Sequence, residues 1–271
     1  MLRLIALFTC TTVLLCGVAV ASERHFTQMY ESNVLPQNSV EIETWNTLRM
    51  AKDSYFMRLD HRLEFEFGLT DQLQTALYLN LGSTGSRQGS EIATESEFTS
   101  ISSEWKLKLS DSVGDAIGSA LYFELSAGAQ EYEVEAKIIL DKRMDRWLFA
   151  FNGVYEHEIT VLGDELRKEH KASAIAGATY FFSDHMTLGV EAFGKAVFEA
   201  EHVAGGGHGD LAMEHAAVWA GPVLGYAAKG WWAAVSITPQ LAGLAGTSAG
   251  SSLNLDEFER AQARILLGFH L

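Results

Sequence analysis

Residues 55–81 read YFMRLDHRLEFEFGLTDQLQTALYLNL. In the first half of this stretch, apolar side chains alternate with charged ones. The charged positions are Arg58, Asp60, Arg62, Glu64 and Glu66. Successive side chains of a β-strand point to opposite faces, so this pattern predicts a strand with one apolar and one charged face. A short turn at 70–72 and renewed alternation up to Leu81 predict a long hairpin.

The apolar face of such a hairpin has two possible environments. It can pack into the core of a soluble sheet protein, or it can face the lipid around a transmembrane barrel. The rest of the chain is needed to decide between them.

Residues 1–21 predict a cleaved secretory signal peptide. Arg3 provides a basic start, an uncharged apolar run follows, and Ala19 and Ala21 form a small-x-small cleavage site. The run is too short for a retained membrane helix. Cys10 and Cys16, the two cysteines of the chain, lie within this segment. We therefore expect an exported protein whose mature form has no disulfides.

The charge of the chain excludes one class of partner. The formal net charge is −15, and removal of the signal peptide takes away Arg3 and no acidic residue. Phosphate binding requires a basic surface, so we do not expect a nucleic-acid partner. About 250 mature residues can form a single β-barrel or sandwich.

Alternation continues through residues 37–271 and predicts twelve strands. Tight connections are expected at 70–72, 111–118, 142–145, 183–185 and 228–230. Long loops are expected at 82–96, 159–166, 199–215 and 242–256. The two kinds lie at opposite ends if the strands run up and down, as in outer-membrane barrels with short periplasmic turns and long outer loops. We therefore predict an all-β fold, a transmembrane antiparallel up-and-down β-barrel of about twelve strands.

The end of the chain agrees with an outer-membrane location in a Gram-negative cell. Ile265, Leu267, Phe269 and Leu271 share one face of the last strand, a pattern similar to the C-terminal signal read by the barrel-assembly machinery. We expect that machinery and outer-membrane lipid as partners. Aromatic side chains are expected at the membrane interfaces, namely Trp105, Trp147, Tyr155, Trp231 and Trp232.

The charged faces of the strands should point into the lumen. The predicted lumen-lining residues are Glu41, Glu43, Arg58, Asp60, Arg62, Glu64, Glu66, Glu104, Lys106, Lys108, Glu124, Glu133, Glu135, Lys137, Glu191, Lys195 and Arg264. One interpretation is a salt-bridge network that fills a narrow barrel, and the other is a hydrated lumen that selects solutes. Because both signs are interleaved, strong selectivity for one sign of ion is not implied.

No residue pattern predicts catalysis, a metal site or a cofactor. Glu133 and Glu135 merely share a face of one strand. His61 lies on the apolar face, where pairing should place it between Thr44 and Leu81 at the headgroup level. The histidines of loop 199–215 have metal-ligand chemistry, but their spacing matches no closed site.

Three stretches resemble an uncharacterised family of Gram-negative outer-membrane barrels. They are LPQNSVEIETW at 35–45, DHRLEFEFGLTDQLQTALYLNL at 60–81 and GPVLGYAAKGWWAAVSITPQL at 221–241. The resemblance implies a porin-like β-barrel and assigns no catalytic or binding residues.

The sequence thus favours a passive channel for an unidentified small solute, with residues 22–36 able to fold inward as a lumen plug. The alternative is a closed barrel with a structural or surface-interaction role, acting through its outer loops. A lipid-modifying enzyme is the least favoured of the three hypotheses.

Overall fold

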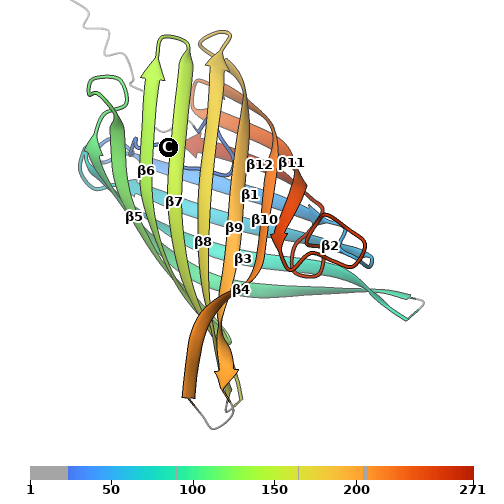
Figure 1. The fold of residues 1–271 in the computed structure, drawn as a ribbon. Helices are drawn as coiled ribbons and strands as arrows, with labels where there is room; N and C mark the ends of the chain where they lie inside the picture. The colour runs from blue at the N-terminus through green and yellow to red at the C-terminus, as the bar shows by residue number, and fades with distance from the viewer. Residues whose placement is uncertain (1–23, 90, 164, 204–206) are drawn as a thin grey trace, which may run out of the picture.

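The computed structural model describes residues 24–89, 91–163, 165–203 and 207–271, so the predicted signal peptide lies outside the described residues. Twelve antiparallel strands close into one barrel, as predicted, each pairing with its neighbours in sequence and β1 pairing with β12 (Figure 1). The strands are β1 (Val40–Met50), β2 (Phe56–Gly68), β3 (Leu73–Gln88), β4 (Glu91–Ser110), β5 (Gly118–Gly128), β6 (Glu131–Met144), β7 (Trp147–Leu162), β8 (Glu165–Phe181), β9 (Met186–Val203), β10 (Gly207–Ala228), β11 (Trp231–Ala245) and β12 (Ala261–His270).

The alternation of side chains explains which face is outside. In the β2–β3 hairpin, Leu63 pairs with Leu79 and Phe65 with Leu77, and Leu77 remains 52% exposed on the outer surface. The neighbouring positions Glu64 and Glu66 are buried inside the barrel. A wall with an apolar outside and a charged inside is the arrangement that suits a barrel surrounded by lipid. No helix in the described part of the chain is long and apolar enough to cross a membrane.

The strands differ in length, and this corrects the prediction of long loops. Residues expected in loops at 82–96, 159–166 and 199–215 mostly continue as paired strands, and β10 reaches 22 residues. A tilted strand needs only about 9–11 residues to cross the hydrocarbon layer. Beyond that layer both faces of a strand can be polar, so the alternation that marks a strand in the sequence disappears although the backbone pairing persists.

The barrel therefore has two different ends. We call one the turn end, because it carries the short connections 69–72, 145–146 and 229–230 and the C-terminal residue. We call the other the hairpin end, because β3–β4 and β9–β10 project from it (Figure 1). The loop predicted at 242–256 is present at this end, with bounds of 246–260. It folds back so that Leu255 and Phe258 are buried.

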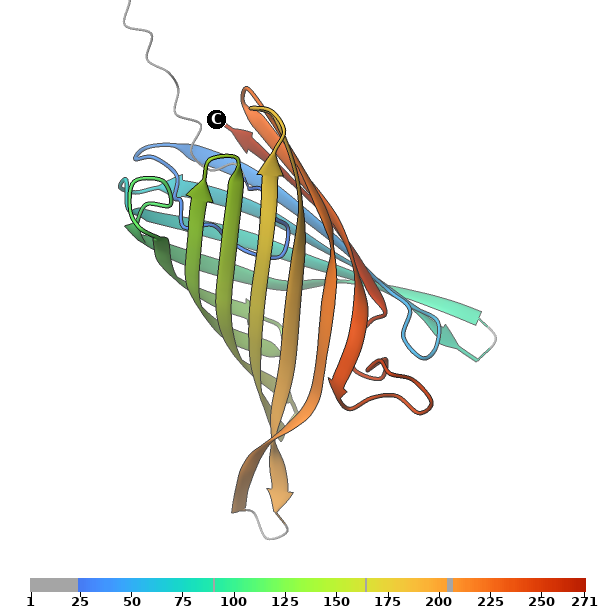
Figure 2. The same cartoon turned by 45° about the horizontal axis from the view of Figure 1, so that its top comes forward.

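The residues before β1 enter the barrel. Residues 24–36, which we call the N-terminal segment, run within the ring of strands near the turn end (Figure 2). Phe26, Thr27 and Ser32 of this segment are 0% exposed. The lumen at this level is therefore occupied by the chain itself.

Candidate functional site

Five glutamates of β1, β2 and β4 meet inside the turn end, and we call them the inner carboxylate cluster: Glu41, Glu43, Glu64, Glu66 and Glu104. Strand register explains the gathering, because Glu41 pairs with Glu66 and Glu43 with Glu64. Glu66 and Glu104 are both opposite Ala76 of β3. None of the five is more than 3% exposed. One carboxylate oxygen from each of Glu64, Glu66 and Glu104 lies within 4.8 Å of the others.

The five carboxylates are not equally well satisfied. Trp232 Nε1 donates a hydrogen bond to Glu41 at 2.6 Å, and Trp45 Nε1 donates one to Glu43 at 2.7 Å. By contrast, no N–H or O–H donor among the described residues reaches either oxygen of Glu64 or Oε1 of Glu104, although Glu64 is close enough to Glu66 to share a proton. A buried polar group without a partner is costly and needs an explanation. The cluster thus contains acceptor capacity that the protein's own donors leave unused.

Inward side chains hold the backbone of the N-terminal segment. Asn152 of β7 does so twice, because it accepts a hydrogen bond from Tyr30 N at 2.6 Å and donates one to Tyr30 O at 2.9 Å. Three other inward side chains accept hydrogen bonds from backbone N–H groups of the segment. Glu191 of β9 accepts from Thr27 and Gln28, Asp141 of β6 from Ser32, and Gln74 of β3 from Leu35. The segment is therefore attached to strands from several sides of the ring.

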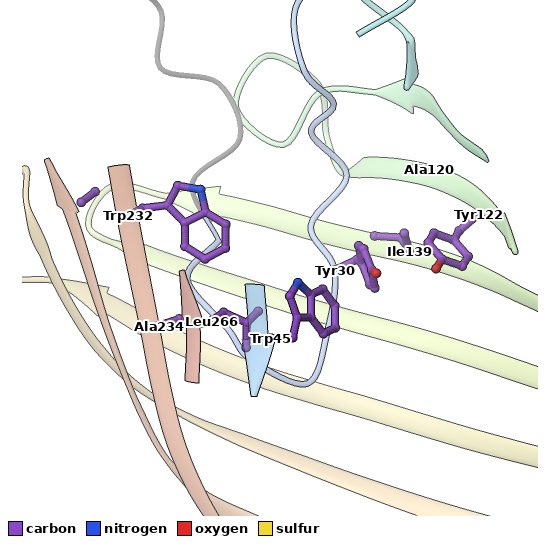
Figure 3. Close-up of a cluster of buried hydrophobic side chains, with 9 residues drawn as sticks. Tyr30, Trp45, Ala120, Tyr122, Ile139, Trp232, Ala234 and Leu266 are labelled. Atoms are coloured by element: carbon purple, nitrogen blue, oxygen red, sulfur yellow. The ribbon is translucent and has the colours of Figure 1, made fainter. Parts of the chain in front are cut away.

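Two apolar contacts support these hydrogen bonds. Tyr30 lies between Trp45 and Tyr122, with ring centroids 5.9 and 4.9 Å away (Figure 3). Phe26 and Met29 pack in a second cluster with Leu148, Ala150 and Val223 of the wall. Gly177 of β8 makes room for this cluster, because a Cβ there would lie 2.3 Å from Met29 Cε and 2.8 Å from Phe26 Cε1.

Arg24 brings a positive charge to the inner carboxylate cluster. Its guanidinium carbon lies 4.0 Å from the ring centroid of Tyr30 and 4.2 Å from that of Trp45. Its Nη1 lies 3.6 Å from Glu43 Oε2, and its Nη2 donates a hydrogen bond to Met29 O at 3.2 Å. A guanidinium between aromatic faces and beside a carboxylate gains both cation–π and ionic attraction.

A cavity of about 710 Å³ lies on the hairpin side of the N-terminal segment, and we call it the outer cavity. Gln28 and Tyr30 of the segment are among its lining residues. Arginines line it from β1, β2 and β12, namely Arg49, Arg58, Arg62 and Arg264. Glutamates line it from β6 and β7, namely Glu131, Glu133, Glu135 and Glu156. Since β1 and β7 are opposite in the ring of strands, the cavity has a more basic wall facing a more acidic one.

The charges of the outer cavity form ion pairs, and several of them are partly exposed. Arg49 Nε and Arg58 Nε both contact Asp60 at 2.6 Å, and these three side chains are 30–34% exposed. Lys195 Nζ lies 3.1 Å from Glu156. This half of the lumen contains ion pairs and open space together.

The structure places the predicted lumen residues in four locations. The turn end contains six of them: Glu41, Glu43, Glu64, Glu66, Glu104 and Lys106. Of these, Lys106, Glu43 and Glu66 also border a cavity of about 20 Å³. The outer cavity is lined by nine of the predicted residues, namely Arg58, Asp60, Arg62, Glu124, Glu133, Glu135, Lys137, Lys195 and Arg264. Glu191 holds the N-terminal segment, and Lys108 lies at the β4–β5 turn, where its Nζ contacts Asp111 and also Asn33 of the segment.

Sequence reasoning missed several inner residues. Glu156 and Lys171 line the outer cavity but were not among the predicted lumen-lining residues. Arg24 was missed because the N-terminal segment has no periodicity.

Two side-chain placements need correction. Trp232 was expected at the membrane interface, but it is 0% exposed and points inward, whereas Trp231 remains 38% exposed. Adjacent residues of a strand must face opposite ways. His61 pairs with Leu81 as expected, but its partner on β1 is Asn46 instead of Thr44, with Nδ1 2.9 Å from Asn46 Oδ1.

The histidine-rich stretch at 199–215 does not form the expected loop, since most of it is strand. The side chains of His202 and His208 lie outside those that the structure describes. His215 is described, and its Nδ1 lies 3.0 Å from Asn254 Nδ2.

Comparison with solved structures shows the same architecture. The COG4313 outer membrane channel from Pseudomonas putida F1 matches with a TM-score of 0.65 and 11% identity, over 91% of this chain and 100% of that chain. The translocator domain of autotransporter NalP from Neisseria meningitidis matches with a TM-score of 0.47 and 11% identity, over 86% and 88%. The KdgM porin in complex with disordered oligogalacturonate matches with a TM-score of 0.43 and 10% identity, over 84% and 98%. At 11% identity, the likeness to the outer membrane channel from Pseudomonas putida F1 concerns the fold.

No curated protein matches the chain. A family model does match, and it covers residues 18–271. The chain therefore belongs to the Family of unknown function (DUF6662).

Proposed function

We propose that this protein is an outer-membrane channel for small solutes whose lumen is closed by the N-terminal segment. The outer cavity carries the proposal, because it is a charged, partly hydrated space whose lining includes the segment itself. Solutes would enter from the hairpin end and pass the turn end only when the segment leaves. Passage would be passive diffusion along the charged wall.

The placement in the outer membrane is part of the proposal. It is supported by the exposed apolar belt, the predicted signal peptide and the apolar pattern of β12, which the barrel-assembly machinery would recognise. The fold is similar to that of a bacterial outer membrane channel.

Planar-bilayer recording tests the channel function. The refolded mature chain should give small or rare currents, and a variant lacking residues 24–34 should give larger and more frequent ones. The absence of current from both proteins would contradict a channel.

A reversible cross-link provides a sharper test in the full chain. Ser32 Oγ donates to Asp141 Oδ1 at 2.7 Å, and the predicted mature chain has no cysteine of its own. In a Ser32→Cys, Asp141→Cys variant, oxidation should hold the segment in place and suppress current, and reduction should restore it. The Ser32→Cys single variant is the control and should not respond to oxidation.

A second candidate function is a permanently closed barrel that acts through its projecting strands. The many hydrogen bonds to the N-terminal segment and the length of β9 and β10 favour it. It predicts that neither the deletion nor reduction of the cross-link produces current.

A further inference from the structure

The inner carboxylate cluster has more negative charge than the barrel wall beside it neutralises. On the wall, Lys106 borders the same small cavity as Glu43 and Glu66, and His270 Nδ1 lies 2.6 Å from Glu41. The carboxylate of Glu64 is fully buried, and no N–H or O–H donor among the described residues reaches it; its neighbours are two other carboxylates within 4.8 Å, one of which, Glu66, is close enough to share a proton with it. Such an arrangement is costly unless a cation or protons occupy it.

On the wall, Arg62 of β2 also attracts Glu64. The guanidinium paired with Glu43, however, does not belong to the wall. It is Arg24 of the N-terminal segment, in contact with the face of Trp45 and 3.6 Å from Glu43. Its Nε and Nη1 have no hydrogen-bond partner among the described residues. The wall therefore holds this cation by charge and by an aromatic face, without a close bidentate pair, and such contacts can be made equally well by a cation from solution.

We propose that Trp45 and the inner carboxylate cluster form a binding site for organic cations of the guanidinium type, which Arg24 fills while the lumen is closed. This inference rests on the proposed channel function and names its solute class. A cationic solute reaching the site takes the place of Arg24 and so favours the open state. With the segment displaced, the cluster becomes an acidic patch on one side of the lumen, formed by β1, β2 and β4, and carboxylates that line a pore favour cations. The interleaved charges seen in the sequence gave no such preference.

The competition should operate at millimolar solute. When the rest of the segment has left its docked position, Arg24 remains tethered to the barrel by about fifteen residues before β1, and short flexible tethers give effective concentrations in the millimolar range. A solute whose affinity for the site equals that of Arg24 must therefore reach a comparable concentration before it displaces Arg24.

Chemical complementation tests the site without requiring current. The full mature chain with Arg24→Ala, in detergent, should unfold about 2–4 °C below the wild type. Methylguanidinium chloride at millimolar concentration should restore the midpoint, whereas methylurea, which is neutral and of similar shape, should not. Adding Glu43→Gln and Glu64→Gln to Arg24→Ala should abolish the response to methylguanidinium.

Two outcomes would overturn the site: no shift with methylguanidinium, or an equal shift with methylurea. If Arg24→Ala does not refold, Arg24→Lys keeps the charge and loses the planar group over Trp45. The Arg24→Lys variant should unfold at a lower temperature than the wild type, and methylguanidinium should raise its midpoint, as it does for Arg24→Ala.

Reversal potentials in a KCl gradient test selectivity separately. The Arg24→Ala channel should pass K⁺ over Cl⁻ by several-fold, and the triple variant Glu43→Gln, Glu64→Gln, Glu66→Gln should lower that permeability ratio toward about one. Glu169→Gln, on the inner face of β8 outside the cluster, is the matched control and should leave the ratio unchanged. A ratio that the triple variant does not alter contradicts the inference. No current from any variant contradicts the channel itself, and the complementation result then decides the site alone.

Discussion

The two halves of the lumen carry the same kinds of side chain in different surroundings. At the turn end, Glu41, Glu64 and Glu104 are 0% exposed. Around the outer cavity, Arg49 and Asp60 keep 34% and 31% of their side-chain surface exposed, and they pair at 2.6 Å. The same inward alternation produces both sets.

What differs is the N-terminal segment. It fills the turn end with Phe26, Met29 and Tyr30, and it leaves the hairpin end open. Burial removes water from the carboxylates, so each one depends on the protein for a partner. Charges around the outer cavity keep water as an alternative partner, and individual ion pairs there matter less. The difference between the two halves is therefore a difference in hydration that thirteen residues impose.

Removing the two hydrogen bonds between Asn152 and the backbone of Tyr30 should have the largest effect on the difference in hydration between the two halves of the lumen. In Asn152→Leu, Tyr30 loses two buried hydrogen bonds to its backbone, at a cost of about 2–4 kcal/mol in docking of the segment. Trypsin cleavage after Arg24, followed by mass spectrometry in detergent, should become much faster. Asn80→Leu on β3, which faces the outer cavity, is the matched control. Equal protection of Arg24 in Asn152→Leu and wild type would show that the segment is held by other contacts.

Filling the space over β8 should have the next largest effect. In Gly177→Ala, the added Cβ collides with Met29 and Phe26, and it also lies 2.9 Å from Val190 O. We expect a loss of about 1–3 kcal/mol in stability. Chemical denaturation should show it, and a second substitution, Met29→Ala, should recover part of the loss. No recovery in the double variant would mean that the strain lies against the backbone of β9 and not against the segment.

Substitution in the hydrated half should change stability little. Asp60→Asn removes the charge that Arg49 and Arg58 share, yet the pairs are partly exposed, so we expect a loss of less than about 1 kcal/mol. Urea unfolding of the refolded protein measures it. A loss above about 2 kcal/mol would contradict the view that this half is hydrated.

The smallest effect is expected outside both halves, in the turn between β4 and β5. A hydrogen bond from Lys108 and two from the N–H groups of Gly114 and Val113 hold the pKa of Asp111 below its ordinary value. A lowered pKa contributes stability above the ordinary pKa, and that contribution is lost as pH falls through the lowered value. Asp111→Asn should therefore be slightly less stable than wild type at neutral pH.

The same pair of proteins should converge in acid. Thermal unfolding at a series of pH values below 4 or so would follow the difference as Asp111 becomes protonated. Asp184→Asn, in the turn between β8 and β9, is the control. A difference that stays constant down to the lowest pH would show that the charge of Asp111 is not what stabilises the turn.

Local pattern was enough to predict much of the fold. Alternation around Arg58–Glu66 identified a two-faced strand, and the same rule predicted twelve strands and the inward direction of Glu41, Glu104 and Lys137. It failed where both faces are polar, so the ends of β9 and β10 were interpreted as a loop. Trp232 was misplaced for another reason: it was assigned to the interface by residue type, although strand parity already placed it inside.

By itself, then, the sequence determined the wall of this protein: its strands, their order and the side on which each charge lies. These features depend on side chains two positions apart, a relation that is visible in the chain. Only the tertiary structure decided what the wall encloses. The register of β1 to β4 sets which glutamates face one another, and the position of Tyr30 beside Trp45 depends on Tyr122 and Asn152 of strands far away in the sequence. No periodicity records contacts of that kind, because they arise when the ring closes around the segment.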